Sequence, residues 1–231
     1  MLLNNYNNRI DLLIDWILSV VPRGARILDV GASDGSFCPE MRRLRDHGMI
    51  LAGVDPDKHR LKKNPLLIER FFGTLERANV PPETFDCLVV NYVFEHVADP
   101  LVFLNAAYRT LAPGGSLFFI TPNGFHFFTL ISKVFAALRI QSFVLQRIRS
   151  PELVTAYHHH AIYRLNNPGT IKKLAFESGY YEVQFRHSEK LEELTPYFPG
   201  ATKIFPRLWE HFASAMHWEK ILLNLMGRLI K

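Results

Sequence analysis

Two kinds of hydrophobic pattern alternate along the first half of the chain. Short apolar runs bounded by glycine, proline or aspartate predict strands at 26–30, 50–54, 66–72, 85–91 and 116–121. Apolar residues at helical spacing predict an amphipathic N-terminal helix, followed by helices over 37–47, 57–63 and 101–111. This alternation predicts a doubly wound α/β fold with a mostly parallel sheet.

The pattern changes after Asn123. A long apolar, aromatic and basic stretch follows over 125–149, and a late helix and strand are expected at 169–178 and 180–186. Apolar residues then recur at helical spacing through 203–231, and no clean strand is evident after Arg186. We therefore expect a single domain over 1–231, with a helical insert at 124–168 and a helical tail at 187–231.

One segment, 110–132, contains no Asp, Glu, Lys or Arg and has the length of a membrane-spanning helix. Helix-breaking residues interrupt it at Pro113, Gly114 and Gly115, and again at Pro122 and Gly124. The segment is therefore expected to form a turn, a strand, a second turn and the start of a helix.

Composition and charge indicate the class of protein and where a charged partner could bind. The 231 residues are 48% hydrophobic and 21% charged, as in a folded globular domain. The formal net charge is +5, but residues 1–123 carry 13 basic and 14 acidic side chains, whereas residues 124–231 carry 14 basic and 8 acidic ones. The positive excess therefore belongs to the predicted insert and tail.

The two cysteines and the N-terminal apolar stretch indicate the cellular compartment of the protein. Cys38 and Cys87 provide neither a disulfide framework nor a CxxC site. Asp11 and Asp15 interrupt the first apolar stretch, which no basic leader precedes, so it does not resemble a signal peptide. A cytoplasmic setting is expected.

The segment RILDVGASDGSF, 26–37, carries the most informative pattern. A predicted buried strand ends at Asp29 and runs into a turn in which Gly31 and Gly35 permit close approach of the backbone to a ligand. The next strand ends at Asp55, about 20 residues further on, where a carboxylate can accept hydrogen bonds from both ribose hydroxyls. This pairing favours a ligand that contains adenosine.

Two other nucleotide sites fit less well. The dinucleotide motif GxGxxG needs glycine at positions that here hold Ser33 and Ser36, and the phosphate-binding motif GxxxxGK[ST] is absent. Both the oxidoreductase and the P-loop interpretations are weakened.

Three sequence blocks resemble the class I S-adenosylmethionine-dependent methyltransferases, in particular the small-molecule branch of ubiquinone and menaquinone biosynthesis methyltransferases. The blocks are ILDVGASDGSF (27–37), FDCLVVNYVFEHVADP (85–100) and RTLAPGGSLFFITPN (109–123). A weaker fourth block is HAIYRLNNPGTIKKLAFESGY (160–180). The resemblance implies the Rossmann-like methyltransferase fold, S-adenosylmethionine as cofactor and S-adenosylhomocysteine as product.

By position, the resemblance also implies the cofactor contacts. The methionine part is expected near Asp29, Gly31, Ala32, Ser33 and Gly35. The ribose is expected at Asp55 and Pro56, the adenine at Thr74 and Leu75, and the methionine amine at the backbone of Asn91 and Tyr92. Two positions depart from the family pattern, because Ser33 replaces the usual middle glycine and Thr74 replaces the usual adenine-binding Asp.

A candidate base follows the fourth predicted strand, at the carboxyl edge where ligands bind in open parallel sheets. His96 in FEHVADP is the leading candidate for a general base, although it and Glu95 fit a structural role in the loop equally well. A related Glu-x-x-Glu-His pattern holds a divalent cation, but Tyr92 occupies its first position here, so no metal is expected. The triplet 158–160 is a poor zinc site, and by family position His160 is expected to line the acceptor pocket.

The insert allows two interpretations. From Gly124 to Ser150 there are four basic and no acidic residues, and the apolar side chains of 125–138 fall largely on one helical face. Two short helices are expected, either as a structural cap on the sheet or as an aromatic lid over the acceptor that also touches an anionic membrane. His126 suits either the pocket or an aromatic cluster.

Two functions stay open at this point. The first is methyl transfer to a small or lipid-like acceptor at oxygen or carbon, without nucleic acid as a partner. The second is a catalytically inactive methyltransferase-fold protein that binds through its basic aromatic surface, which Ser33 and Thr74 favour.

Overall fold

The computed structural model describes residues 9–137, 161–188, 204, 208–209, 211–212, 216 and 218–231. Within these residues the helices and strands follow in the order α1 (Arg9–Val20), β1 (Arg26–Val30), α2 (Met41–Asp46), β2 (Ile50–Asp55), α3 (Lys58–Leu61), β3 (Glu69–Phe72), β4 (Phe85–Asn91), the 3-10 turn η1 (Phe94–His96), α4 (Pro100–Thr110), β5 (Leu111–Pro122), α5 (Phe127–Ala137), α8 (Pro168–Glu177), β6 (Glu182–Ser188), η5 (Glu219–Ile221) and β7 (Asn224–Ile230).

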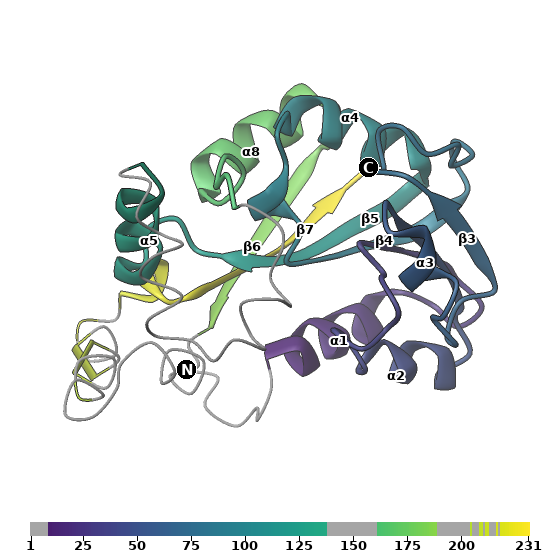
Figure 1. Cartoon of the computed structure of the whole chain (residues 1–231), viewed down its shortest axis with the longest axis horizontal. Helices are drawn as coiled ribbons and strands as arrows, with labels where there is room; N and C mark the ends of the chain where they lie inside the picture. Colours follow the sequence, from purple (N-terminus) through teal and green to yellow (C-terminus); the bar gives the residue numbers. More distant parts are fainter. Residues whose placement is uncertain are drawn as a thin grey trace.

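The strands of the described residues form one seven-stranded sheet in the order β3-β2-β1-β4-β5-β7-β6 (Figure 1). β1 pairs in parallel with β2 and β4, and the parallel pairing extends to β3 on one side and β5 on the other. β7 is antiparallel to both β5 and β6. The predicted doubly wound, mostly parallel sheet is confirmed.

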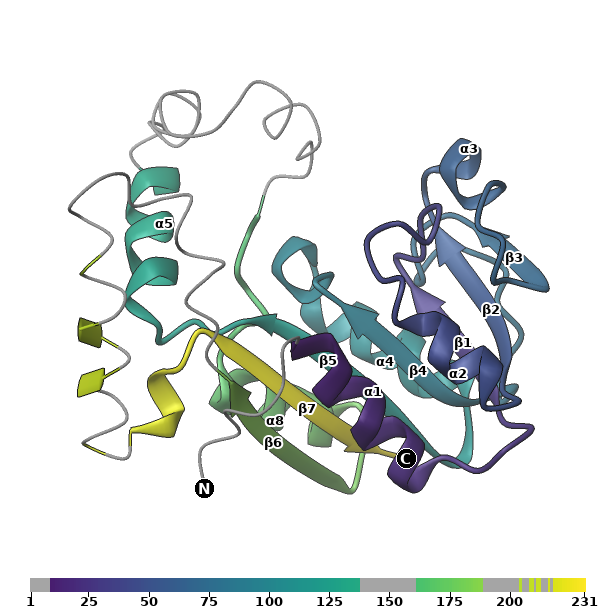
Figure 2. The same cartoon turned by 90° about the horizontal axis from the view of Figure 1, so that it is seen from below.

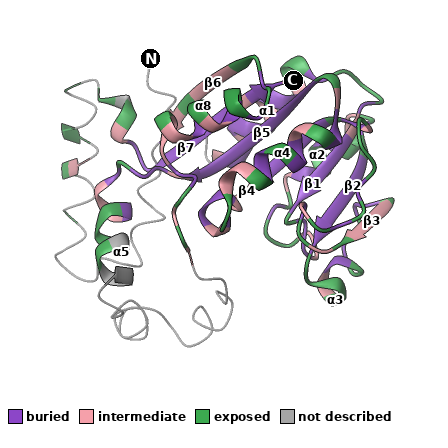
Figure 3. Ribbon diagram, turned by 90° about the horizontal axis from the view of Figure 1, so that it is seen from above, coloured by how far each residue is buried: buried purple, intermediate pink, exposed green. Residues whose placement is uncertain are grey.

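Helices cover both faces of the sheet. α1 and α2 lie on one face, whereas α4 and α8 lie on the other (Figures 1 and 2). Each face has its own apolar core, and β5 contributes Phe118 to the first and Phe119 to the second. Because both faces are buried, the central strands are almost continuously buried (Figure 3) and show no alternation of apolar and polar residues.

Two helix starts follow local sequence signals. The Asp99 carboxylate accepts the Val102 N–H at the start of α4, and the Asn167 side chain accepts the Gly169 N–H at the start of α8. A proline follows each cap at the first helical position, where a missing N–H costs nothing. These helices were predicted to within a residue or two of their observed bounds.

The predicted helical tail is wrong at its end. Residues 224–230 form β7, the antiparallel strand that had no evident candidate in the sequence, instead of a helix. The segment is buried on both faces, and its run of Leu and Met residues therefore carries no strand periodicity. Glycine is required at position 227 of this strand, because a Cβ there would lie 2.3 Å from the Phe119 ring on the neighbouring strand.

The uncharged segment 110–132 forms the last residue of α4, β5, a turn and the start of α5, so the expected strand, second turn and helix start are confirmed. The turn expected at 113–115 is instead part of β5, where the pairing with β4 is irregular. Among the helices that the structure describes, none is long and apolar enough to cross a bilayer. α5 is the first of the two helices expected in the insert, and the position of the second lies outside the described residues.

Candidate functional site

The glycine-rich turn follows β1 at the carboxyl edge of the parallel strands. Gly31 has a φ of 81°, and its N–H donates to the Val54 carbonyl at 2.8 Å. A Cβ at position 31 would lie 2.7 Å from Val93 Cγ2, so glycine is required for both conformation and space. Ser33 also adopts the left-handed conformation, with a φ of 44°, although it is not a glycine. The local strain at Ser33 is of the order of 1 to 2 kcal/mol.

Asp55 is the last residue of β2 and is 8% exposed. Its Oδ2 accepts the Ser33 N–H at 2.9 Å, and its Oδ1 accepts the Asp57 N–H at 2.7 Å. A carboxylate oxygen can accept about two hydrogen bonds, so each oxygen retains capacity for a ligand hydroxyl. Asp55 therefore shapes the glycine-rich turn and can bind at the same time.

Asn64 holds the glycine-rich turn in place through its side chain. The sequence did not indicate this role. Its buried side-chain amide donates to the carbonyls of Ala32 and Ser33, at 3.1 and 3.3 Å. A Cβ on Gly35 would lie 3.1 Å from the Asn64 Oδ1. An Asn before a proline is typical of any turn, so nothing in the sequence marks this contact.

Asp29 and Asn91 place buried hydrogen-bond acceptors near the carboxyl ends of the neighbouring strands β1 and β4. Asp29 is 6% exposed, and burial together with the nearby charge of Asp55 raises its pKa to about 7. Asn91 ends β4, beside β1, and its buried Oδ1 has no hydrogen-bond partner among the described residues. Acceptors of this kind suit a positively charged donor, which would also stabilise the ionised form of Asp29.

Two further residues lie near the carboxyl edge of the sheet: Arg9 supplies a positive charge, and Tyr92 has a strained backbone. Tyr92 follows β4 with a φ of 53°, and its hydroxyl donates to the Asn224 Oδ1 at 2.6 Å. The Arg9 guanidinium lies 4.6 Å from the centre of the Tyr92 ring, and its charge lowers the pKa values of Glu95 and Cys38 against the effect of burial. Sequence reasoning missed Arg9, because its segment shows only the start of an amphipathic helix.

The remaining predicted positions follow β2 and β3. Pro56 is exposed directly after Asp55. Thr74 is exposed, and its carbonyl accepts the N–H groups of Arg77 and Ala78, whereas Leu75 is 2% exposed. Since β2 and β3 are paired, the structure brings the predicted cofactor positions together at the carboxyl ends of four adjacent strands.

Glu95 is a buried carboxyl in η1, directly after β4, and it is 5% exposed. Its Oε2 accepts the Thr121 hydroxyl at 3.0 Å, and the Asn166 amide in turn donates to that hydroxyl oxygen. Its backbone carbonyl accepts the N–H groups of Ile162 and Tyr163. Glu95 thus ties together the loop after β4, the end of β5 and the segment before α8, while the next residue, His96, is half-buried.

Glu95 is expected to make stability depend on pH. Burial raises its pKa from 4.5 to about 7, although its own N–H, the Thr121 hydroxyl and Arg9 oppose the shift. The folded state therefore holds this proton more tightly, so the free energy of unfolding falls as the pH rises from about 4.5 to about 7. In urea unfolding, the wild type should lose up to about 3 kcal/mol of unfolding free energy relative to Glu95→Gln between pH 5 and pH 8, because the variant has no carboxyl to ionise. Parallel pH profiles for the two proteins would contradict this assignment.

Of the other predicted histidines, His126 lies in an aromatic cluster, whereas His160 lies outside the described residues. His126 is fully buried, its Nδ1 accepts the Phe128 N–H, and its ring lies 4.5 Å from Phe127 and 5.8 Å from Trp209. His160 and the rest of the triplet 158–160 lie outside the described residues. In the part of the chain that the structure describes, no three His, Cys, Asp or Glu side chains come together as a metal site.

A family model described as a methyltransferase domain matches residues 6–180 of this chain. The chain belongs to the methyltransferase domain family. The resemblance drawn from the three sequence blocks is thereby confirmed, with S-adenosylmethionine as the cofactor of the class.

Curated relatives and solved structures agree with this membership. The human mitochondrial ubiquinone biosynthesis O-methyltransferase is 34% identical over 134 residues, which are 50% of this chain and 36% of the human protein. A SAM-dependent methyltransferase from Thermotoga maritima has a TM-score of 0.61 at 16% identity, covering 96% of this chain and 88% of its own. Phosphoethanolamine N-methyltransferase 2 of Haemonchus contortus, solved with S-adenosyl-L-methionine, has a TM-score of 0.61 at 14% identity, covering 96% and 52%.

These matches differ in what they show. The chain spans 29% to 36% of the length of the human, rat and mouse relatives. The solved structures share the fold of this methyltransferase domain at low identity. Family and fold are therefore established.

Proposed function

We propose that this methyltransferase domain binds S-adenosylmethionine at the carboxyl edge of its sheet and methylates a small or lipid-like acceptor at oxygen or carbon. The observation that carries the proposal is the pairing of the Gly31 turn with Asp55, which holds the turn through the Ser33 N–H and keeps acceptor capacity. The buried Asn91 Oδ1 and the raised pKa of Asp29 also fit a cationic ligand.

Each residue of the edge has a task in this proposal. Asp55 accepts hydrogen bonds from the ribose hydroxyls, with Pro56 beside it. Asp29 and Asn91 accept from the methionine ammonium, and Arg9 balances the methionine carboxylate. The glycine-rich turn of Gly31, Ala32, Ser33 and Gly35 lets the methionine part approach the backbone. Thr74 and Leu75 border the adenine, and the backbone of Tyr92 continues the wall from β4.

In this reaction the main tasks of the protein are to align the acceptor with the methyl group and to exclude water. When bound, S-adenosylmethionine supplies an activated methyl group that the acceptor takes by in-line displacement. His96 is proposed as the base that removes a proton from a hydroxyl acceptor, because it follows β4 at the carboxyl edge. Oxygen is the favoured acceptor atom, because the curated relatives are named O-methyltransferases. His160 stays a predicted acceptor-pocket residue.

Cofactor affinity should rise with pH. The ionised form of Asp29 attracts the cationic ligand, and about half of this carboxyl is protonated near pH 7. Below pH 7 binding must therefore expel a proton, and affinity should fall by up to about tenfold for each pH unit. Titration calorimetry of S-adenosylhomocysteine from pH 5.5 to 8 measures this slope.

Two variants identify the group responsible. Asp29→Asn should bind more weakly and with a flat profile, whereas Glu95→Gln should retain the slope although Glu95 has a similar pKa. If the pH dependence of affinity persisted in Asp29→Asn and disappeared in Glu95→Gln, the proton would belong to Glu95, and the assignment to Asp29 would be wrong.

Catalysis is tested by transfer of labelled methyl groups. The protein is incubated with methyl-labelled S-adenosylmethionine and hydroxylated aromatic acceptors, with and without a hydrocarbon side chain. The proposal predicts Asp55-dependent label in the extracted acceptor. Cofactor binding without transfer to any acceptor, including a total lipid extract, would support the inactive binding protein instead.

A further inference from the structure

The carboxyl edge of the sheet continues beyond the positions proposed for the cofactor. β5 ends at Pro122, β7 begins at Asn224 and β6 ends at Ser188, and the three residues lie opposite one another across the paired strands. They form a row along the same edge as the ends of β1 and β4. Ligands of open α/β sheets bind at this edge, and the proposed cofactor site gives the row no task.

Two buried polar groups of this row have no hydrogen-bond partner among the described residues, the Asn224 Nδ2 and the Ser188 Oγ. Asn224 is 1% exposed and Ser188 is 7% exposed. Directly opposite residues of an antiparallel pair point to the same face, with Cβ atoms about 4.5 to 5.5 Å apart. Two neighbouring donors are therefore withheld from water without compensation, which destabilises the unliganded protein.

Both side chains point to the face that α1 covers. Side chains two residues apart in a strand share a face, and Met226, two residues after Asn224, belongs to the apolar core under α1. The guanidinium of Arg186, two residues before Ser188, lies 4.0 Å from the centre of the Trp16 ring on α1. α1 lies across β5 and β7 in Figure 2. The row therefore lies on the same face as Arg9 and Tyr92.

The strained backbone of Tyr92 serves the same row. Asn91 shares the face of Val89, which belongs to the core under α1, so the next side chain of a regular strand would point to the opposite face. The φ of 53° instead directs Tyr92 to the α1 side, where its hydroxyl donates to the Asn224 Oδ1. Strain of this kind is concentrated at functional positions. Here it orients the Asn224 amide so that the Nδ2 keeps its hydrogens for another partner.

The unpaired groups of the row select an uncharged hydrogen-bond acceptor. The Asn224 Nδ2 can donate two hydrogen bonds and the Ser188 hydroxyl one, and neither group carries a charge. A buried carboxylate would require a cation, and Arg9, which lies over the Tyr92 ring, already balances the cofactor carboxylate in the proposed function. A carbonyl oxygen accepts two hydrogen bonds without bringing a charge.

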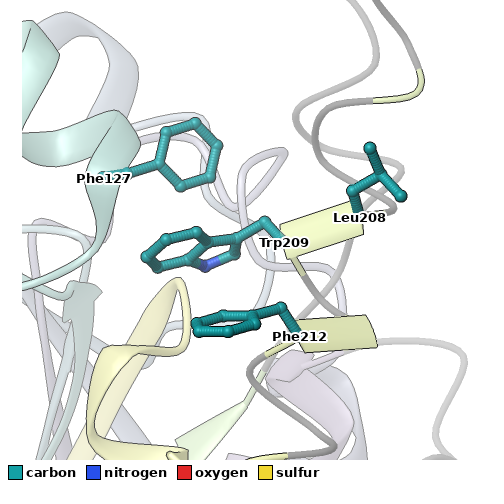
Figure 4. Close-up of a pocket in the computed structure, with 4 residues that line it drawn as sticks. All are labelled: Phe127, Leu208, Trp209 and Phe212. Carbon is teal, nitrogen blue, oxygen red and sulfur yellow. The ribbon is translucent and has the colours of Figure 1, made fainter.

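The apolar cavity beside α5 matches a carbonyl group less well. Phe127, Leu208, Trp209 and Phe212 line a space of about 420 Å³ (Figure 4). The indole N–H of Trp209 is the one hydrogen-bonding group of these four side chains. A carbonyl oxygen would therefore find a single side-chain donor in the cavity, whereas the row offers two side chains that donate.

We propose that Asn224 and Ser188 form a subsite for a carbonyl oxygen of the methyl acceptor, and that Tyr92 positions Asn224. β7 lies two strands from β4, a distance of about 10 Å, so this carbonyl belongs to a part of the acceptor remote from the cofactor contact at Asn91. Both donors are shielded from solvent in this state, so entry of the acceptor requires a local opening of the edge. The subsite rests on the proposed function, because its ligand is the acceptor of the methyl group.

Titration calorimetry with matched probes tests the subsite. Dihydroxyacetophenone carries a carbonyl, ethylcatechol replaces it with a methylene group, and dihydroxybenzoate replaces it with a carboxylate. In the presence of S-adenosylhomocysteine, the wild type should bind the ketone about tenfold more tightly than ethylcatechol, and the benzoate no more tightly than ethylcatechol. No preference for the ketone, or a benzoate affinity as high as that of the ketone, would overturn the proposal.

Two buried serines provide a matched pair of variants. Ser178, at the end of α8 on the other face, is 9% exposed, and its Oγ also has no partner among the described residues. Ser188→Ala and Ser178→Ala each remove such a hydroxyl, so neither should lower stability in urea unfolding. Only Ser188→Ala should reduce the preference for the ketone, by about fivefold to tenfold. Equal ketone binding by the two variants, or a loss of stability in Ser188→Ala alone, would contradict a role of Ser188 in the subsite.

Asn224→Asp tests the second donor and keeps the contact with Tyr92. The variant retains an oxygen that accepts the Tyr92 hydroxyl, but it replaces the Nδ2 with an oxygen that cannot donate to a carbonyl. The preference for the ketone should disappear in a protein that circular dichroism shows to be folded, and an unchanged preference would refute the subsite.

Calorimetry with S-adenosylhomocysteine alone keeps the two proposals apart. A ketone preference that depends on Ser188 and Asn224 in a protein without cofactor binding would refute only the proposed function. Cofactor binding without a ketone preference would refute only the subsite.

Discussion

Asp55→Ala is expected to weaken binding of S-adenosylhomocysteine by about 100-fold or more. In the proposed complex both ribose hydroxyls donate to the Asp55 carboxylate, and the substitution would remove these two hydrogen bonds, each worth about 1.5 to 3 kcal/mol. It also releases the Ser33 and Asp57 N–H groups, which Asp55 holds at 2.9 and 2.7 Å. Titration calorimetry measures the loss, and circular dichroism establishes that the variant is folded.

Asp57→Ala is the matched control for this experiment. Asp57 lies two residues away and is exposed, and its carboxylate accepts the Arg60 N–H at the start of α3. We expect an affinity within a few-fold of the wild type, because the variant loses a helix cap worth about 1 kcal/mol and no ligand contact. Asp55→Ala with unchanged affinity would mean that the ribose binds elsewhere.

Gly31→Ala should lower both stability and cofactor binding far more than an ordinary glycine substitution. The new Cβ would adopt a φ of 81° and approach Val93 Cγ2 to 2.7 Å. The backbone strain costs about 1 to 2 kcal/mol, and overpacking adds about 1 to 3 kcal/mol. Since Val93 follows Tyr92, relief of the contact would displace the wall after β4, and binding should fall below detection.

Gly24→Ala separates strain from contact. Gly24 has a φ of 80°, and a Cβ there would meet nothing within 4 Å. Urea unfolding should therefore show the strain alone in Gly24→Ala, and an additional loss in Gly31→Ala, with normal cofactor affinity in the former. Equal destabilisation of the two variants would remove the steric argument for glycine at position 31.

The geometry of the proposed cofactor edge was largely predictable because its pattern is local in sequence. Asp29 near the end of one strand, a turn with Gly31 and Gly35, and Asp55 at the end of the next strand lie within fewer than 30 residues. Parallel pairing then brings the strand ends to one edge without further information. Even Ser33, which departs from the family pattern, adopts a left-handed backbone conformation of the kind that glycine favours.

The rest depended on contacts between distant residues. Asn64 reaches the turn from 31 residues away, and Arg9 approaches Tyr92 from the first described helix. β7 escaped prediction because burial on both faces removed its periodicity, and Gly227 marks a strand only once Phe119 is known to lie against it. The contact of Phe127 with Trp209 likewise joins α5 to a tail residue about 80 positions later in the sequence.

Direct titration with the cofactor tests the central claim, that a methyltransferase site lies at the carboxyl edge of this sheet. Calorimetry of S-adenosylmethionine and S-adenosylhomocysteine with the wild-type protein should show a single site of one-to-one stoichiometry for each. The absence of heat for both ligands at millimolar concentration and pH 8, where Asp29 is ionised, would contradict the account.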